Sequence, residues 1–364
     1  MLANNLMILS FFTVLGLIFG SFTNALVRRI HEGKKISEGR SECPKCKNQL
    51  KFWDLIPLFS WIFLRGKCRY CSEKIGIRYP LVEFFFGFFF FLTTFFLFPE
   101  NFFGTFQNFF LSGGDFFTNL KNFFSSSENF SEILNFFLIL FLVGNFLVLA
   151  IYDILFLEII DGIAIWIGFL ALGLSFTDFG FVGFQDGFLG FLIIYTFFYL
   201  QILIPGIIFF VKGEFLGQKK FFSLKEKISG IGKIFSSYFI FPIWMFLRLF
   251  FSEKFLEKFK IFADEQKNFQ GKEFEIPAWI GGGDLRFALV MGFILGWQKS
   301  ILALFISYLI GGIYSIIFMI FEKISGKNFS HEIPFLPFLT LGTFLVLLFG
   351  DEILSFYFEN FLYL

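Results

Sequence analysis

The sequence predicts an all-α polytopic membrane protein with about eight transmembrane helices and a cytoplasmic zinc-binding loop domain. Of its 364 residues, 56% are hydrophobic and 16% are charged, whereas soluble proteins carry about 25% charged residues. Several apolar runs are long enough to cross about 30 Å of hydrocarbon. The loops between these runs differ sharply in Lys and Arg content, which assigns each loop to a side of the membrane. All four cysteines lie in one of the basic loops.

The amino-terminal part contains two predicted spans. Residues 1–27 hold the first span, at about 7–27, and its apolar run continues into the chain without a small-residue cleavage site. Residues 28–78 form a polar segment rich in Lys and Arg, which places it in the cytoplasm. Residues 79–132 comprise the second span and an outer loop whose one cation is Lys121.

The carboxy-terminal part, residues 133–364, contains the other six predicted spans. The cationic segments again fall on one side of the membrane, so that eight spans with both termini outside satisfy the charge of every loop. These six spans cover about 133–152, 162–176, 187–211, 285–297, 301–321 and 335–349.

A lysine-rich cytoplasmic insertion occupies about residues 212–280. Within it, residues 234–251 are apolar and long enough to cross the membrane. A single extra crossing would put the flanking lysines on opposite faces, against the positive-inside rule. We therefore expect an interfacial or re-entrant helix, continued by a basic amphipathic segment of the kind that lies on anionic lipid.

The four cysteines predict a metal site in residues 28–78. Cys43 and Cys46 form one CxxC pair, and Cys68 and Cys71 form a second pair after a gap of 21 residues. Two such pairs can surround one tetrahedral Zn²⁺ with four thiolates. Two disulfides, or unpaired buried thiols, are the alternatives, but a reducing cytoplasmic location favours structural zinc.

Three aspartates lie at the cytoplasmic ends of predicted spans: Asp153, Asp161 and Asp284. A carboxylate at the edge of hydrocarbon is costly, so it is a candidate functional group. Two aspartates from different helices can share one proton and activate water, one as base and one as acid. Helix capping is the alternative, and for Asp161 it stays open. Before Asp284, the glycines at 281–283 permit close approach of another backbone.

Other features argue against rival chemistry and partners. The two histidines, His31 and His331, lie in separate predicted loops and form no nucleophile–histidine arrangement. The formal net charge of +1 says nothing about partners. We expect the lipid bilayer, and no nucleic acid, as a partner. A transporter would place acids near span centres in paired repeats. A non-catalytic zinc-loop scaffold is a further alternative.

Motifs along most of the chain support a more specific interpretation. The chain resembles the bacterial type IV prepilin peptidases, which are GxGD-type intramembrane aspartyl proteases with a second, N-methyltransferase activity. The matching motifs, in chain order, are residues 20–24 (GSFTN), 43–46 (CPKC), 56–61 (IPLFSW), 64–71 (LRGKCRYC), 78–83 (RYPLVE), 153, 160–161, 281–286 (GGGDLR), 295–297 (LGW) and 333–338 (IPFLPF).

The resemblance implies an inner-membrane enzyme whose active site faces the cytoplasm. It would cleave the leader of type IV prepilins or pseudopilins and transfer a methyl group from S-adenosylmethionine to the new amino terminus. Structural zinc would be held by the four cysteines. The implied catalytic pair is Asp153 and Asp284, with Asp161, Gly281, Gly283 and Arg286 in supporting positions.

The chain departs from the family pattern at several positions. Ile160 stands where the family has proline, Arg286 stands for lysine, and Leu336 stands for the glycine of IPFGP. The segment between the implied catalytic acids is about twice the usual length. The S-adenosylmethionine-binding residues are not identified by sequence, so a peptidase without methyltransferase activity stays an alternative.

Overall fold

The computed structural model describes residues 2–35, 41–43, 45–99, 127–177, 181–212, 214–215, 218–219, 282–325 and 333–362. These residues belong to two compact units. The first unit comprises Met1–Ile163, Thr177–Phe181 and Leu302–Leu364, and the second comprises Ala164–Phe176 and Val182–Ile301. The predicted interfacial segment 234–251, Gly281 and His331 lie outside the described residues.

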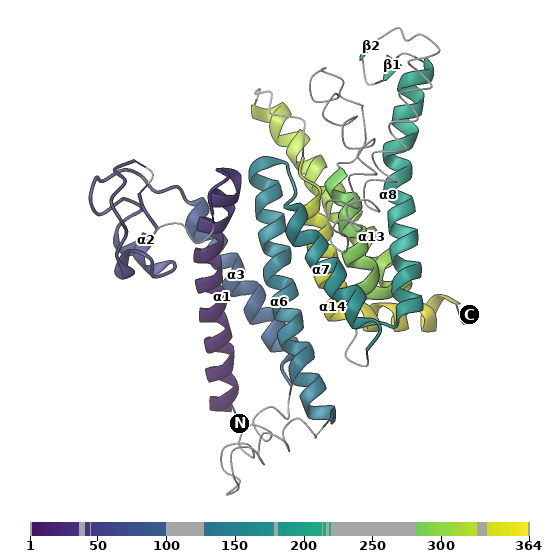
Figure 1. Cartoon of the computed structure of the whole chain (residues 1–364), viewed down its shortest axis with the longest axis horizontal. Coiled ribbons are helices and arrows are strands. Elements are labelled where there is room, and N and C mark those ends of the chain that lie inside the picture. The colour runs from purple at the N-terminus through teal and green to yellow at the C-terminus, as the bar shows by residue number, and fades with distance from the viewer. Residues whose placement is uncertain are drawn as a thin grey trace, which may run out of the picture. The chain divides into compact units, whose positions relative to one another are not determined.

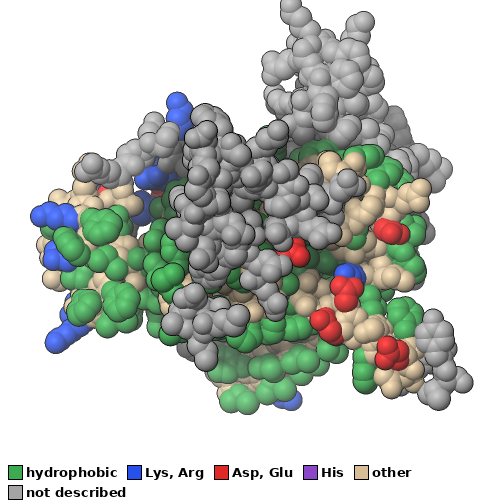
Figure 2. Space-filling view, turned by 90° about the horizontal axis from the view of Figure 1, so that it is seen from below, with side chains coloured by type: hydrophobic (Ala, Val, Ile, Leu, Met, Phe, Trp, Pro, Cys, Tyr) green, Lys and Arg blue, Asp and Glu red, His purple; other side chains and the backbone are tan. Residues whose placement is uncertain are grey.

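The described part is almost entirely helical, which confirms a polytopic all-α membrane protein. Six helices are long and apolar enough to cross a membrane, and α7 is a shorter apolar helix. In the view of Figure 2, apolar side chains cover much of the described surface, as lipid-facing helices require. The six long helices are α1 (Leu2–His31), α3 (Arg78–Leu97), α6 (Ser127–Phe156), α8 (Phe184–Lys212), α13 (Gly282–Ser325) and α14 (Leu336–Tyr357), and the shorter one is α7 (Asp161–Leu174).

The remaining elements are short. A 3-10 turn, η1 (Phe52–Asp54), and a five-residue helix, α2 (Phe59–Phe63), lie in the cysteine-containing segment. Strand β1 (Glu214–Phe215) pairs antiparallel with β2 (Gln218–Lys219) just after α8. A π-helical turn, η4 (Phe358–Leu362), follows α14.

Two of the predicted spans, 285–297 and 301–321, both lie in α13, which consists of two helical segments joined at a kink. The Ser300 hydroxyl donates to Met291 O at 3.1 Å; in a straight helix, residues nine positions apart would be about 13 Å from each other, so the chain changes direction between them. The helix is broken at Gly296, whose φ of 71° and ψ of 180° are not helical. Glycine adopts this conformation at little cost because it lacks a Cβ atom. The total of eight crossings stays a prediction.

The end of α1 corrects the prediction for His31. We expected the first span to end near residue 27 and His31 to lie in a loop, but His31 is the last residue of α1. Its ring stacks on Phe156 with the centroids 3.7 Å apart. Arg28 pairs with Glu32 one turn later, so the helix continues beyond its apolar part.

Close packing of α1 against α3 organises the first unit (Figure 1). A Cβ atom on Gly16 would lie 2.6 Å from the carbonyl oxygen of Phe86, and one on Gly20 would lie 2.7 Å from the Cα of Glu83. Glycine at both positions therefore permits the two backbones to approach. The core continues onto α6, where Phe136 meets Phe12 edge to face with centroids 5.1 Å apart.

Glycine also permits close helix packing in the second unit. Gly168 of α7 lies against Leu289 of α13, where an added Cβ would be 2.5 Å from a leucine methyl carbon. A Cβ on Gly292 of α13 would lie 2.2 Å from the backbone nitrogen of Phe191 in α8. Helices α7 and α8 therefore both pack directly on the first half of α13.

Candidate metal centre and candidate catalytic carboxylates

The two CxxC segments adopt the same local fold. In the first, the backbone N–H of Lys47 donates to Cys43 O at 2.9 Å, and the N–H of Cys43 donates to Asn48 O at 3.0 Å. In the second, Ser72 donates to Cys68 O at 2.9 Å, and Cys68 donates to Glu73 O at 2.8 Å.

The two CxxC segments also share their backbone angles and the β-bridges that flank them. Lys47 and Ser72, at equivalent positions, have positive φ values of 58° and 57°. Isolated antiparallel bridges then join Glu42 with Gln49 and Lys67 with Lys74. The two pairs of cysteines therefore sit on two copies of one tight turn.

The turns bring all four sulfurs together. The four Sγ atoms lie within 4.8 Å of one another, and those of Cys43 and Cys71 are 3.8 Å apart. Four thiolates at about 2.3 Å from a tetrahedral Zn²⁺ would be about 3.8 Å from each other. All four cysteines are free, with no disulfide between them. The donor set and its dimensions fit a tetrahedral metal ion.

The thiols are unequal in acidity. Burial raises the pKa of Cys43, but hydrogen bonds from the backbone N–H groups of Cys46 and Lys45 outweigh it and lower that pKa to about 7. The backbone N–H of Glu73 lowers the pKa of Cys71, yet burial and the neighbouring sulfurs together raise it to about 12. Cys43 therefore loses its proton more readily than Cys71.

Asp54 fixes the second turn to the rest of the small domain. Its side chain is 3% exposed and accepts hydrogen bonds from Arg69 Nε at 2.6 Å, the Lys51 N–H at 3.0 Å and the Tyr70 hydroxyl at 3.3 Å. Arg69 and Tyr70 are the two residues between Cys68 and Cys71. Burial raises the pKa of Asp54, but these donors outweigh it and hold the pKa below its usual value.

The domain is joined to both membrane helices that flank it. The Leu58 N–H donates to Glu83 Oε2 at 2.8 Å, and the Ser21 hydroxyl bonds the same carboxyl group. Asn24 Nδ2 donates to the carbonyl oxygen of Tyr79 at 3.1 Å. The GSFTN and RYPLVE segments therefore meet at one place, where α1 and α3 contact the domain.

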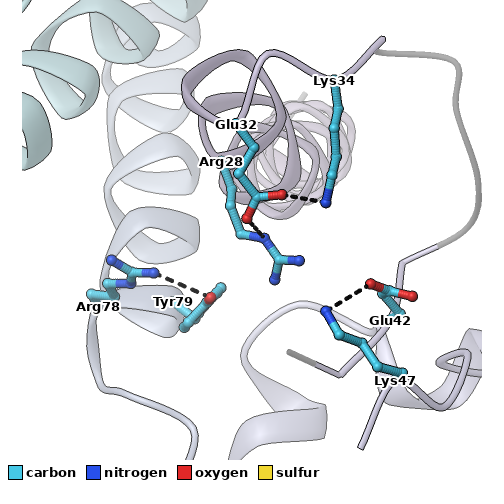
Figure 3. Close-up of polar contacts among 7 residues, drawn as sticks. All are labelled: Arg28, Glu32, Lys34, Glu42, Lys47, Arg78 and Tyr79. Atoms are coloured by element: carbon cyan, nitrogen blue, oxygen red, sulfur yellow. Dashed lines mark hydrogen bonds and ion pairs between the residues drawn. The ribbon is translucent and has the colours of Figure 1, made fainter. Parts of the chain in front are cut away.

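Exposed charges surround this junction (Figure 3). Glu32 accepts from Arg28 at 3.0 Å and from Lys34 at 2.6 Å, and Lys47 reaches Glu42 at 3.4 Å. The Lys34 hydrogen bond is the main cause that lowers the pKa of Glu32. Such exposed pairs contribute little to stability, so the buried contacts of Asp54 and Glu83 are the ones that position the domain.

Asp153 lies three residues before the end of α6, which is the cytoplasmic end by the predicted topology. Its Oδ2 atom accepts a hydrogen bond of 3.2 Å from the backbone N–H of Leu336, the first residue of α14. The first N–H groups of a helix have no partner within it, and they favour a negative charge. Leu336 stands where the resembled family has glycine, and it supplies the contact through its backbone.

Asp161 and Asp284 each lie in the first turn of a helix. Asp161 is the first residue of α7, and Asp284 is the third residue of α13. Asp284 is 7% exposed, which is unusual for a carboxylate. Asp153 belongs to the first compact unit and Asp284 to the second, so their pairing stays a prediction. Gly283 and Arg286 lie beside Asp284 in α13.

Sequence reasoning missed two residues with structural roles in this region. Asp54 is the one acid between Lys51 and Lys67, and that isolation in a cationic segment was the available signal. Glu83 was noticed only as part of a motif. Its bond to Leu58 joins residues 25 positions apart, and no local pattern reports such a contact.

Comparison with known proteins places both halves of the chain. Residues 14–97 match the model of the bacterial peptidase A24 N-terminal domain, and residues 139–316 match that of the type IV leader peptidase family. The first match contains the four cysteines, and the second contains Asp153, Asp161 and Asp284. No solved structure matches the chain with significance.

Several curated relatives carry the name prepilin leader peptidase/N-methyltransferase. The chain is 46% identical to that of Myxococcus xanthus over 81 residues, which are 22% of this chain and 24% of the relative. It is 41% identical to that of Vibrio cholerae over 83 residues (21% and 33%), and 36% identical to that of Klebsiella pneumoniae over 96 residues (25% and 42%). The chain thus spans between 24% and 42% of the length of these relatives. The two family models match successive segments that together cover most of the sequence, so both parts of the chain are similar to type IV leader peptidases.

Proposed function

We propose that this protein cleaves the leader peptide of type IV prepilins or pseudopilins, with Asp153 and Asp284 as its catalytic pair. The observation that carries the proposal is the position of Asp153. It lies near the end of a membrane helix, it receives the first N–H of α14, and it falls within the segment matched by the leader-peptidase model. A costly carboxylate at that depth is a candidate functional group.

The chemistry requires one ionised and one neutral carboxyl group. Two carboxylates held a few ångströms apart share one proton, because both cannot ionise together. The ionised member accepts a proton from water, whose oxygen attacks the scissile carbonyl carbon. The neutral member then protonates the leaving amide nitrogen. The Leu336 N–H orients the Asp153 carboxylate, and Asp161, Gly281, Gly283 and Arg286 support the site.

The cysteine cluster holds structural Zn²⁺ in this proposal. Cys43, Cys46, Cys68 and Cys71 supply four sulfur ligands, which closes the coordination sphere and leaves no position for a reacting water. The metal therefore fixes the fold of the domain between α1 and α3. That domain would methylate the new amino terminus with S-adenosylmethionine, in keeping with the relatives' names. The enzyme would lie in the inner membrane with both activities facing the cytoplasm.

Incubation of the purified protein with a prepilin peptide tests both activities by mass. We expect a cleaved product and a second product that is heavier by one methyl group. Asp153→Asn and Asp284→Asn should each reduce cleavage by at least about 100-fold, the lower end of what a general acid or base contributes. Asp186→Asn, in the first turn of α8, is the matched control and should retain activity.

The outcomes separate the alternatives. Cleavage without methylation would identify a peptidase only. An active Asp153→Asn enzyme would transfer the base role to Asp161 with Asp284. Unchanged cleavage by the Asp284→Asn variant would refute the proposed catalytic pair, and no cleavage by wild type would leave a scaffold or a transporter. Unaltered melting of each variant establishes that activity, and not folding, has changed.

The proposal also requires that residues 234–251 do not cross the membrane. Two acids on opposite faces, about 30 Å apart, could not share a proton, so an even number of crossings must separate Asp161 from Gly281. Cysteines introduced near Lys225 and Lys260 should both be labelled from the cytoplasmic side. Labelling of the two sites from opposite sides would exclude the eight-span topology and the catalytic pair together.

A further inference from the structure

The metal domain presents an apolar face that its own fold does not cover. We name it the η1–α2 face, and it consists of Phe52, Trp53, Phe59, Ile62 and Phe63. These side chains are 75%, 68%, 57%, 62% and 81% exposed, in that order. The rings of Phe52 and Trp53 lie edge to face, 5.7 Å apart, and η1 contacts α2. A concentration of exposed aromatic side chains in so small a domain marks an interaction surface.

These side chains are not exposed because the domain is too small to bury an aromatic residue. In the same five-residue helix, Trp61 turns toward the domain, and its indole N–H donates to Ile75 O at 3.1 Å. A Cβ on Gly66 would lie 3.0 Å from the Trp61 ring, so that ring is closely packed. The helix therefore has one side that faces the domain and another, bearing Phe59, Ile62 and Phe63, that faces outward.

The position of the face along α3 indicates membrane depth. Leu58, the residue before α2, is bonded to Glu83, which lies five residues into the span that begins at Arg78. Five residues of helix correspond to about 8 Å. Amphipathic segments that rest on a bilayer bury their apolar side about 5–10 Å into the boundary between headgroups and acyl chains. Helix α2 thus begins at the depth of an interfacial segment.

The backbone at Leu58 supports a fixed placement. Leu58 has a φ of 60° and a ψ of −51°, a conformation that is costly for a residue with a Cβ atom. Its hydrogen bond to the Glu83 carboxyl group holds this conformation and thereby sets the direction in which α2 leaves α3.

The charges around the face match an anionic surface. Lys51 precedes Phe52, and Arg65 and Lys67 follow α2; all three side chains are exposed. The one acid between them, Asp54, is 3% exposed and bound to Arg69. In Figure 2, apolar side chains are interspersed with Lys and Arg on the part of the surface where basic side chains gather. Aromatic residues beside Lys and Arg are typical of segments at membrane interfaces.

We infer that the η1–α2 face lies in the headgroup region of the anionic bilayer that α1 and α3 cross. Both ends of the domain are continuous with these two membrane helices, and the face begins at interfacial depth with cations beside it. Lipid is therefore the occupant that depth, composition and charge jointly indicate. This inference needs a membrane-embedded chain but no catalytic activity, so it is independent of the proposed function.

Lipid-borne quenchers test this placement. The full-length protein is reconstituted in phosphatidylcholine vesicles, with or without phosphatidylglycerol, that carry bromine at a shallow or a deep acyl position. The emission of Trp53 is obtained as the difference between wild type and Trp53→Phe. We expect shallow bromine to quench this difference at least about twofold more than deep bromine, because the face is interfacial. Phosphatidylglycerol should increase the quenching at low salt.

Matched variants control for position and folding. The Trp61 difference, obtained from Trp61→Phe, should be quenched little by either lipid, because that indole faces the domain. A Phe63→Trp variant should add emission that is quenched like Trp53. Ile62→Ser and Phe63→Ser should reduce the Trp53 quenching while the bound metal stays at the wild-type level. If a serine variant loses its metal, the domain has unfolded and that variant does not test the inference. The quenching of the Phe63→Trp variant then decides whether the face lies in lipid.

Two results would overturn the inference. Quenching of Trp53 by aqueous iodide but not by brominated lipid would place the face in water. A Trp53 that is insensitive to lipid but becomes shielded when an apolar prepilin peptide is added would assign the face to a peptide partner.

Discussion

Asp54→Asn tests whether the buried carboxylate, and not the cysteines alone, holds the metal site. The substitution keeps the size of the side chain but removes its charge and turns one acceptor into a donor. Arg69 Nε, at 2.6 Å, and the Tyr70 hydroxyl, at 3.3 Å, then face a weaker or a repelling partner. Loss of a hydrogen bond between charged groups costs about 2 kcal/mol.

This loss of stability should lower the affinity for the metal by the same free energy, because the metal binds the folded domain. At 1.4 kcal/mol for each factor of ten, a loss of about 2 kcal/mol corresponds to roughly 30-fold weaker zinc binding. Competition with a chromophoric chelator measures the affinity of the full-length protein in detergent. Glu42→Gln makes the same chemical change in the exposed Lys47–Glu42 pair, where the distance is 3.4 Å, and should weaken binding at most about threefold.

The zinc affinities of the two variants show whether the buried hydrogen bonds of Asp54 stabilise the metal site. If Asp54→Asn binds zinc as tightly as wild type, the three donors around Asp54 do not stabilise the site. If Glu42→Gln weakens binding equally, the effect belongs to the overall charge of the domain and not to the buried network.

Two further predictions follow from the packing and from the thiols. Gly20→Ala should lower the melting temperature, because its Cβ would lie 2.7 Å from the backbone of Glu83. Gly144→Ala, where the nearest neighbour of the added Cβ is at 3.7 Å, should not lower it. If the two variants melt at the same temperature, α1 and α3 can move apart without loss of stability. Zinc affinity should rise with pH above a pH of about 6, because Cys43 loses its proton near a pKa of about 7 and Cys71, with a pKa of about 12, must be deprotonated by the metal. Calorimetry in two buffers should record proton release on zinc binding, and pH-independent affinity without proton release would contradict it.

Sequence patterns predicted the helices and the clustering of the four cysteines well, because both are local properties. Apolar runs define membrane helices through their length, and each predicted span lies in a helix of the structure. The spacing of Cys43, Cys46, Cys68 and Cys71 predicted one cluster, and the sulfurs are together. Charge also predicted the polar segment between α1 and α3.

Contacts between distant residues were beyond such patterns. An interruption was expected between the spans at 285–297 and 301–321, and the structure has one as a kink at Gly296. Its exact residue depends on the packing of the chain around it, which no local pattern reports. The positive φ of Leu58 could not be predicted from the sequence, since leucine rarely adopts a positive φ. Its bond to Glu83 exists only once α3 is in place.

The hydrogen bond from Leu336 to Asp153 spans 183 residues of chain and has a consequence for the order of synthesis. During translation, α6 enters the membrane long before α14 has been made. In the proposed enzyme, the Asp153 carboxylate therefore lacks its orienting donor until the last membrane helix is inserted. A nascent or truncated chain would carry both aspartates without that donor. Orientation of the Asp153 carboxylate by this hydrogen bond is thus tied to the insertion of the last membrane helix.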